Sequence, residues 1–189
     1  MVVVSVPDKG IKIESSREAK AFLENIGIYY ERWNTGKISS DEINPEKILE
    51  AYDEEVSRLM KIGGYTTADV IDMKPDTPGL DSMLLKFRKE HTHSEDEVRY
   101  TIEGRGIFYI HPKTDEVVSV EVETGDLIRI PRGTKHWFDL CNEKRIRAIR
   151  LFQDPAGWTP YYTGSGKEQS YEPVCFGPSY IPPTKQRGS

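Results

Sequence analysis

From Thr66 onward the chain consists of short runs in which apolar and polar residues alternate, separated by Gly, Pro and Asp. Alternation puts every second side chain on the same face, which is typical of half-buried β-strands. Strands this short and numerous, with turns at regular spacing, predict a β-sandwich or barrel. The expected strands cover residues 68–73, 83–93, 97–102, 106–111, 117–122, 126–130, 136–140 and 146–152, and those at 97–102 and 106–111 are expected to form a hairpin.

Two helical patterns precede the strands. Ser15-Ser-Arg-Glu18 is a capping box ahead of an apolar-periodic run that Gly27 is placed to end. The second pattern has Asn44 as its cap and Pro45 at the first helical position, and it continues with apolar residues three and four apart up to Gly63-Gly64. We interpret both helices as packing against the sheet and not as carriers of chemistry.

The length of 189 residues favours a single domain over residues 1–189. Within it, residues 1–65 are expected to form a strand and helical N-terminal part, residues 66–163 a β-barrel with the functional site, and residues 164–189 an irregular C-terminal tail. The stretch after Gln153 is rich in Pro, Gly and Tyr, and residues 178–189 show no periodicity, so the last few residues are expected to be disordered.

Composition narrows the partners and the compartment. The 26 basic and 31 acidic residues give a net charge of −5 without a basic block, which argues against nucleic acid as a partner. The apolar start stops at Pro7, too early for a secretory or membrane segment, so a cytoplasmic protein without membrane association is expected. Cys141 and Cys175 are far apart and favour reduced thiols, with a single bridge left open. A closed barrel has no free edge strands and favours a monomer.

Three of the four histidines, with one glutamate, suggest a metal site. His91 and His93 share a face if they lie on a strand, and Phe87 would share it too. The expected hairpin would bring Glu97 back beside them, and His136 would add a third imidazole. Two imidazoles and a carboxylate are typical of facial non-haem Fe(II) sites, and this set favours Fe, Ni or Mn over structural zinc. An isolated His-x-His could also be an ordinary polar surface strand.

The spacing of further residues argues against an ordinary polar surface strand. His-x-His, three residues, Glu, six residues and Gly104 are followed by Gly125, five residues, Pro131-x-Gly133, two residues and His136. These two blocks resemble the motifs of the cupin superfamily, except that Leu140 stands where Asn is common. Cupin barrels include oxidases, isomerases, decarboxylases, storage proteins and regulators, so this likeness alone leaves the function open.

Further residues resemble the acireductone dioxygenase family, which uses oxygen in methionine salvage. The resemblance runs from about Lys86 to Tyr161 and rests on Glu97-Val-Arg-Tyr-Thr-Ile-Glu-Gly-Arg-Gly-Ile-Phe, Arg147-Ala-Ile-Arg-Leu-Phe and Gly157-Trp-Thr-Pro-Tyr. It implies a mainly β cupin fold, a double-stranded β-helix or jelly-roll barrel, with two or three N-terminal helices outside it. It also implies one Fe(II) or Ni(II) per chain, held by His91, His93, Glu97 and His136, with two positions left for water or substrate.

The implied substrates are O2 and an acireductone, 1,2-dihydroxy-3-keto-5-methylthiopentene, which when deprotonated can chelate a divalent cation through two oxygens. With Fe(II) the implied products are 4-methylthio-2-oxobutanoate and formate. With Ni(II) they are 3-methylthiopropionate, formate and carbon monoxide. Two alternatives remain at this point: another metal-dependent cupin enzyme acting on a small enol or keto acid, and a non-catalytic ligand-binding cupin.

Five other residues are candidates for the site. Arg99 lies two residues after Glu97 on the same side, where a cation could orient an anionic substrate, although a structural ion pair is the alternative. Arg150 matches a family position, but its strand phase does not show that it faces the metal. Phe87 and Phe138 could line a pocket for the methylthio tail and Trp158 could close it, unless all three are ordinary core.

The remaining polar candidates are expected to lie outside the site. His111 is predicted in a turn, and Glu95, Asp96 and Glu103 are predicted to be solvated turn residues. Neither cysteine is expected to bind the metal, because the set of nitrogen and oxygen ligands is complete without them.

Overall fold

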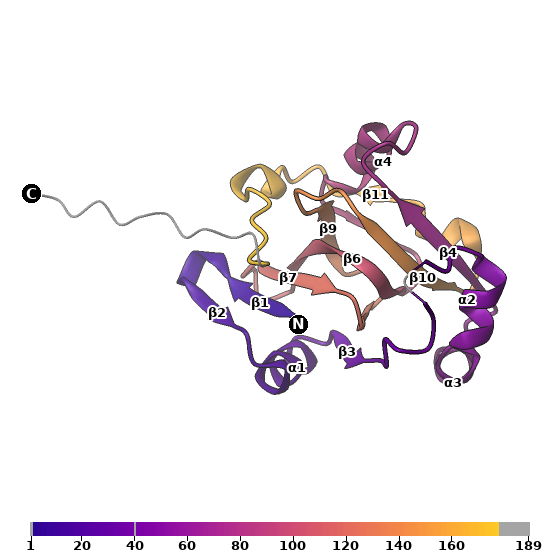
Figure 1. The fold of residues 1–189 in the computed structure, drawn as a ribbon. Coiled ribbons are helices and arrows are strands. Elements are labelled where there is room, and N and C mark those ends of the chain that lie inside the picture. The colour runs from indigo at the N-terminus through magenta and orange to yellow at the C-terminus, as the bar shows by residue number, and fades with distance from the viewer. Residues whose placement is uncertain (1, 40, 178–189) are drawn as a thin grey trace, which may run out of the picture.

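The computed structural model describes residues 2–39 and 41–177, so the predicted disorder of the last few residues lies outside the described residues. The described chain is mainly antiparallel β-structure with helices outside it (Figure 1), which confirms the predicted fold class. The strands are β1 (Val3–Val6), β2 (Ile11–Ile13), β3 (Tyr29–Arg32), β4 (Thr67–Met73), β5 (His91–Thr92), β6 (Glu97–His111), β7 (Val118–Glu123), β8 (Asp126–Ile130), β9 (Lys135–Leu140), β10 (Ile146–Phe152) and β11 (Tyr161–Tyr162).

One long strand, β6, joins the two halves of the barrel. One sheet has the order β11-β5-β9-β6-β7-β1-β2, and in the other β6 lies between β8 and β10, whose outer neighbours are β3 and β4. The predicted hairpin at residues 97–111 is therefore wrong: the chain continues straight through and changes sheets near Gly104. Glycine allows this crossing because its φ is +81° and a Cβ would come within 2.0 Å of the Arg145 carbonyl oxygen.

Gly104→Ala is expected to lower the free energy of unfolding by about 3 kcal/mol or more, since a positive φ and a backbone collision act together. Gly27 is a matched control, because it has the same φ of +81° but open space around the Cβ position. Gly27→Ala should cost only about 1 kcal/mol, the penalty of the left-handed conformation alone. Urea unfolding of both variants measures the difference, and equal losses would show that β6 and Arg145 can move apart.

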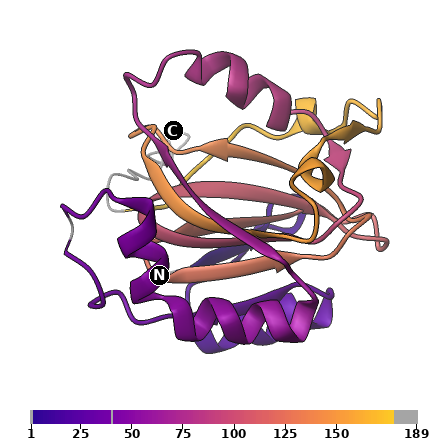
Figure 2. The ribbon, with the colours of Figure 1, turned by 90° about the vertical axis from the view of Figure 1, so that its right-hand side faces the viewer.

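The helices cover the barrel on opposite sides. They are α1 (Ser16–Asn25), α2 (Pro45–Ala51), α3 (Asp53–Gly63) and α4 (Leu80–Phe87), with short 3-10 turns at Pro7–Lys9, Pro155–Trp158 and Lys167–Ser170. Figure 2 shows the strands between α4 on one side and the other three helices on the opposite side. The helices α1, α2 and α4 pack against β3, β4 and β9, respectively. Two or three N-terminal helices outside the barrel were expected, and α1, α2 and α3 lie there.

The predicted caps are present, but the second helix is divided. The Ser15 hydroxyl accepts from the backbone N–H of Glu18, and the Asn44 side chain caps α2. Tyr52 then ends α2 and begins α3, with non-helical backbone angles of −105° and 15°. Its buried ring packs against Trp33 and Tyr100. Periodicity continues across this break, so the sequence pattern predicted one helix where the aromatic packing makes two.

The predicted strand at residues 83–93 is wrong over most of its length. Residues 80–87 form α4, and only His91–Thr92 are a strand. Leu80 and Leu84, one helical turn apart, are buried, and Phe87 packs partly buried against the same core. That core also contains Leu23 of α1 and Phe108 of β6. These apolar residues are three and four positions apart, which is a helical spacing and not the alternation expected of a strand.

Cys141 and Cys175 form a disulfide, with their Cα atoms 5.9 Å apart, so the expectation of reduced thiols is wrong. The bridge joins the end of β9 to a C-terminal segment that is distant in sequence but adjacent in the fold. Spacing could not show this, because the two cysteines are 34 positions apart and β10, β11 and their loops lie between them.

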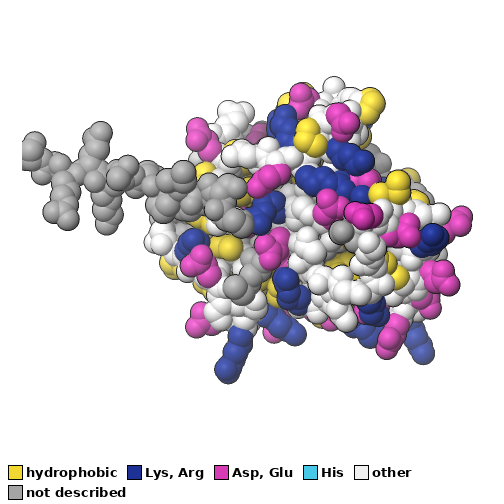
Figure 3. Space-filling model, viewed as in Figure 1, with side chains coloured by type: hydrophobic (Ala, Val, Ile, Leu, Met, Phe, Trp, Pro, Cys, Tyr) yellow, Lys and Arg dark blue, Asp and Glu magenta, His cyan; other side chains and the backbone are white. Residues whose placement is uncertain are grey.

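Lys/Arg and Asp/Glu side chains are interspersed on the face shown in Figure 3. Among the described residues, no helix is both long enough and apolar enough to cross a bilayer.

Candidate metal centre

Four side chains from three neighbouring segments converge inside the barrel. His91 lies in β5 directly opposite His136 of β9, His93 follows β5, and Glu97 is the first residue of β6. Their ligand atoms all lie within 4.8 Å of one another, and the four residues are only 1–3% exposed. The sequence predicted that these four residues are neighbours. The short β5–β9 pairing brings them together, whereas a hairpin at residues 97–111 had been expected to do so.

Backbone carbonyls fix the three imidazoles. The Nδ1 of each histidine lies within hydrogen-bond distance of a main-chain oxygen: His91 on Lys89 at 2.7 Å, His93 on Thr159 at 3.1 Å and His136 on Thr134 at 2.8 Å. An Nδ1–H donor leaves Nε2 with its lone pair toward the centre, which is the form that ligates a cation. Main-chain acceptors carry no side-chain signature, so sequence reasoning missed all three.

The donor set fits a divalent cation. In the part of the chain that the structure describes, no group hydrogen-bonds to the buried His91 Nε2. His93 Nε2 and His136 Nε2 lie 3.2 and 3.0 Å from the same Glu97 carboxylate oxygen. Three imidazole nitrogens and one carboxylate around a common point are a nitrogen- and oxygen-rich set of the kind that binds Fe(II), Ni(II) and related ions. The described residues around this point therefore form a metal site.

Electrostatics favour the ligating forms of His91 and Glu97. Burial, with the nearby His136, lowers the pKa of His91 to about 4, so that imidazole is neutral near pH 7. Burial also lowers the pKa of His93, but the hydrogen bond and charge of Glu97 outweigh it, and the net shift is upward. Burial opposes ionisation of Glu97, yet Arg99 and the imidazoles hold its pKa well below the usual value. The carboxylate is therefore ionised.

Metal-free protein is expected to lose up to about 3 kcal/mol of stability between pH 6.5 and pH 4 because of His91. Its folded pKa is depressed, so the unfolded chain takes up the proton first and the stabilisation is lost as the pH falls. His93 has a raised pKa, and its contribution is fully present below 6.5 and constant in this window. Urea midpoints across the window should flatten in His91→Gln relative to the wild type. Parallel curves for the wild type and His91→Gln would contradict the assignment.

Arg99 is buried beside the ligand carboxylate. One guanidinium nitrogen donates to Glu97 at 2.8 Å, while Nε and Nη1 are buried and have no hydrogen-bond partner among the described residues. The guanidinium carbon lies 4.4 Å from the Phe138 ring centre and 5.7 Å from that of Trp158. Arg99 thus points to the same side as Glu97, as strand alternation predicted. Two unpaired donors on a buried cation can bind an anionic oxygen.

Arg150 lies opposite Arg99 in the β10–β6 pairing, so the two cations are neighbours. Its guanidinium forms a two-point ion pair with Asp69 of β4, at 2.9 and 2.6 Å. It also lies 5.1 Å from the Trp158 ring centre. Arg150 therefore has its own anionic partner, Asp69. The alternation of side chains along a strand could not show this, because Asp69 lies on another strand.

The three candidate aromatic residues lie against the imidazoles or the Arg99 guanidinium. Phe87 belongs to a helix and is not in strand phase with His91, but its ring still reaches the His91 ring at 5.9 Å. Trp158 stacks on His93 with ring centres 6.1 Å apart. Phe138 packs against the Arg99 guanidinium. All three lie near the candidate metal point, where an apolar wall would exclude water.

Glu95 and Asp96, both predicted to be solvated, accept hydrogen bonds, and Glu95 supports the site. Glu95 is buried and accepts from the backbone N–H groups of Gln153 and Asp154 at 2.8 and 2.6 Å, which anchors the turn that carries Trp158. Asp96 accepts from the Tyr65 hydroxyl at 2.7 Å. The prediction for Glu95 was wrong because the loop N–H groups need a buried acceptor, whereas Asp96 is only partly buried.

His111 and Glu103 were also predicted in turns, but both lie in β6 and both are paired. His111 ends β6, where it contacts the carboxylates of Glu90 and Asp115. Glu103 is partly exposed and holds Arg145 at 2.8 Å. Neither residue joins the four-ligand cluster, as predicted.

The antiparallel barrel with its buried His-x-His, glutamate and distant histidine defines a metal-binding cupin. Residues 9–160 match the model of the ARD/ARD′ family. Acireductone dioxygenase of Picosynechococcus sp. is 43% identical over 155 residues, covering 82% of this chain and 88% of the relative. That of Aquifex aeolicus is 41% identical over 168 residues, covering 87% and 91%. The chain belongs to the ARD/ARD′ family of acireductone dioxygenases.

A solved structure agrees with this assignment. Acireductone dioxygenase from Bacillus anthracis, with a cadmium ion in its active centre, superposes with a TM-score of 0.83 at 35% identity. The match covers 86% of this chain and 98% of that one.

Proposed function

We propose that this protein cleaves 1,2-dihydroxy-3-keto-5-methylthiopentene with O2, using one Fe(II) or Ni(II) ion per chain. The proposed products are 4-methylthio-2-oxobutanoate and formate with Fe(II), and 3-methylthiopropionate, formate and carbon monoxide with Ni(II). The observation that carries the proposal is the convergence of His91, His93, Glu97 and His136 in a member of this family. The ligand set is complete within one chain, which supports a monomer, and the sequence features favour the cytoplasm.

The proposed metal ligands are these four residues. A divalent cation held there would supply a Lewis acid and a template for two substrate oxygens. The chain contributes the geometry: three carbonyl acceptors keep each Nδ1 protonated, and Arg99 keeps Glu97 ionised. The site is therefore preorganised and does not have to rearrange when its ligands are used.

Arg99 is proposed to bind the substrate anion. Its Nη2 is occupied by Glu97, whereas Nε and Nη1 are buried and no described residue accepts a hydrogen bond from them. An enediolate oxygen would satisfy this unmet hydrogen-bonding capacity and add the negative charge that a buried cation favours. Arg150 is proposed as a second cation near the mouth of the pocket, restrained by Asp69.

Phe87, Phe138 and Trp158 are proposed to line the pocket for the methylthio tail. Their rings lie against the imidazoles or the Arg99 guanidinium, so they provide apolar contact area and keep water from the charged groups. Burial of Trp158 depends on the turn that Glu95 anchors.

Oxygen uptake with product analysis tests the proposal. Metal-free protein is reloaded separately with Fe(II) and Ni(II) and supplied with enzymatically generated acireductone. Rapid uptake with the 2-oxo acid and formate in the iron form, and carbon monoxide in the nickel form, is expected. Metal bound without uptake above the uncatalysed rate would contradict the proposal and leave a ligand-binding cupin.

A further inference from the structure

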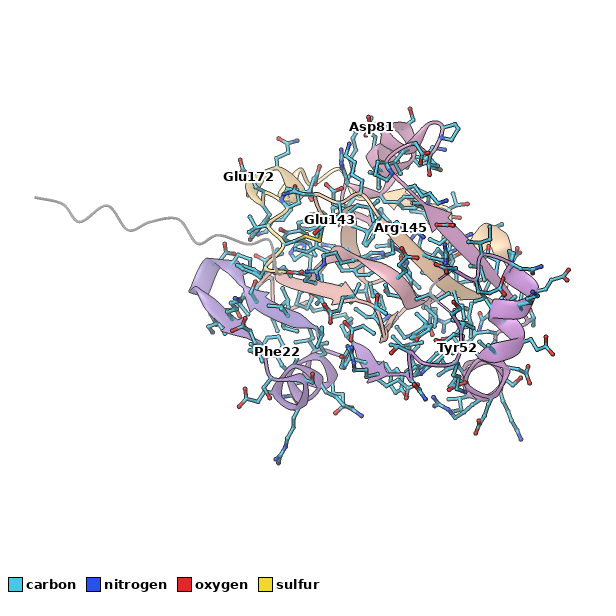
Figure 4. The ribbon with its side chains drawn as sticks, in the orientation of Figure 1. Phe22, Tyr52, Asp81, Glu143, Arg145 and Glu172 are labelled. Carbon is cyan, nitrogen blue, oxygen red and sulfur yellow. A yellow bond between two sulfur atoms is a disulfide. The ribbon has the colours of Figure 1, made fainter. Side chains whose placement is uncertain are left out.

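The Cys141–Cys175 disulfide fastens residues 171–177, which we call the C-terminal strap, to the barrel. Figure 4 shows Glu172 of the strap and Glu143 of the turn after β9 in the same region of the molecule, far from Tyr52. The bridge therefore closes over the end of β9 and not over the helical side.

The strap covers a small apolar cluster on the barrel, separate from the main core. This cluster consists of Ile107, Tyr109, Val117 and Trp137, against which Tyr171 and Cys175 pack. The Tyr171 ring lies 5.9 Å from the Trp137 ring and 6.0 Å from the Tyr109 ring. Burial of these aromatic surfaces therefore depends in part on the strap staying in place.

Non-covalent contacts also hold the strap. Tyr109 donates its hydroxyl to the Glu172 carbonyl at 2.7 Å, and the Phe176 backbone N–H donates to Glu121. Tyr171 donates to Asp8 at 2.6 Å, in an exposed hydrogen bond. Each such bond contributes little net stability, so the covalent link is the strongest single restraint.

The strand beneath the strap carries a proposed metal ligand. On β9, His136 and Trp137 are consecutive, so their side chains point to opposite faces. His136 points to the metal centre, and Trp137 lies in the cluster under the strap. The strap thus packs on the back of the strand that positions His136.

The disulfide can be reached from solvent. Both cysteines line a hollow of about 250 Å³ together with Arg105, Asn142 and Glu143. Cys175 is partly exposed, although Cys141 is only 4% exposed. An attacking thiolate therefore has a route to the Cys175 sulfur, and access of this kind governs thiol–disulfide exchange.

We propose that Cys141–Cys175 is a reversible redox modification site for a dithiol reductant, and that its reduction releases the strap and loosens the hold on His136. One thiolate of the dithiol attacks Cys175 Sγ, the S–S bond breaks, and Cys141 leaves as a thiolate that takes up a proton. The second thiol of the reductant then attacks the mixed disulfide, releasing Cys175. The dithiol is oxidised to a disulfide, and the two cysteines gain two electrons and two protons. In a reducing compartment a lone surface disulfide is typically transient, which suits a regulatory site.

Three measurements on Ni(II)-loaded protein test this inference. Alkylation followed by mass spectrometry, before and after dithiothreitol, reports whether the thiols are blocked and become free on reduction. Chymotrypsin cleavage after Tyr171 should be roughly tenfold faster in the reduced protein, because cleavage follows the population of the open form. Nickel transfer to a chelator should also be roughly tenfold faster, since loss of support around a ligand costs affinity on that scale.

The double variant C141S/C175S, without reductant, is the control for metal chelation by dithiothreitol and should behave like the reduced wild type. Reoxidation of the wild type should restore slow chymotrypsin cleavage and slow nickel transfer. This control does not depend on the folding of the variant. Thiols that are alkylated before reduction, or equal cleavage rates in the two forms, would overturn the proposal. Faster cleavage with unchanged nickel transfer would overturn the link to His136.

Discussion

Replacing Glu97 with Gln is expected to lower metal affinity at least about 100-fold. Loss of a residue that only hydrogen-bonds to a metal ligand typically lowers affinity by less than this. Glu97 supplies the one negative charge among the four proposed ligands, and its carboxylate lies within 3.2 Å of both His93 and His136. The variant also leaves Arg99 buried without its carboxylate at 2.8 Å. Breaking a buried ion pair from one side costs about 3–5 kcal/mol, so stability should fall as well.

Metal content after anaerobic loading and dialysis, together with the urea midpoint, measures both effects. Glu103→Gln is the matched control, because Glu103 lies on the same strand and pairs with Arg145 at 2.8 Å, but is 42% exposed. That variant should keep its metal and most of its stability. Retention of metal by Glu97→Gln would show that three histidines suffice, and would remove the carboxylate from the proposed ligand set.

The ligand neighbourhood was predictable from sequence because it depends on a few side chains whose chemistry is specific. His-x-His, the following glutamate and the distant histidine stand out at fixed spacings, and alternation placed Arg99 beside Glu97. Capping residues Ser15 and Asn44 were equally clear, since a side-chain oxygen at a helix start has a local role.

The structural features that could not be predicted from the sequence depend on contacts between distant segments or on backbone groups. The change of sheet at Gly104 depends on how close the Arg145 carbonyl lies, and the break at Tyr52 depends on two aromatic rings from elsewhere in the chain. The imidazole orientations depend on backbone carbonyl oxygens. Every residue has such an oxygen, so the sequence does not show which ones are used. The disulfide depends on where the C-terminal segment returns.

Two neighbouring cations with a carboxylate at each end of the row explain why the buried Arg99 is tolerated. Asp69 lies opposite Arg150 across β4 and β10, and Arg150 lies opposite Arg99 across β10 and β6. Glu97 then takes one donor of Arg99. Each cation thus has its own carboxylate, but burial still lowers the pKa of Arg99, and Glu97 only partly opposes this. Arg99 therefore remains the less satisfied of the two cations, and an incoming anion would gain most from it.

Arg99→Met is expected to lower kcat/KM by roughly 100- to 1,000-fold, the loss typical for one preorganised donor to developing charge. Methionine keeps apolar contact with Phe138 and Trp158 but offers no hydrogen bond to an anionic oxygen. Metal content should stay near one ion per chain when the ion is in excess, because the bound cation replaces Arg99 as the partner of Glu97. Steady-state oxygen uptake and metal analysis of the same preparation separate the two properties.

Arg99→Lys provides the decisive comparison. Lysine keeps the charge but has a single point of donation, so it should recover part of the lost turnover without reproducing the two unpaired donors of the guanidinium. Recovery by Lys with no recovery by Met assigns the effect to charge beside the substrate. If Met and Lys both match the wild type in kcat and KM, Arg99 serves only to hold Glu97, and the proposed contact with the substrate anion is wrong.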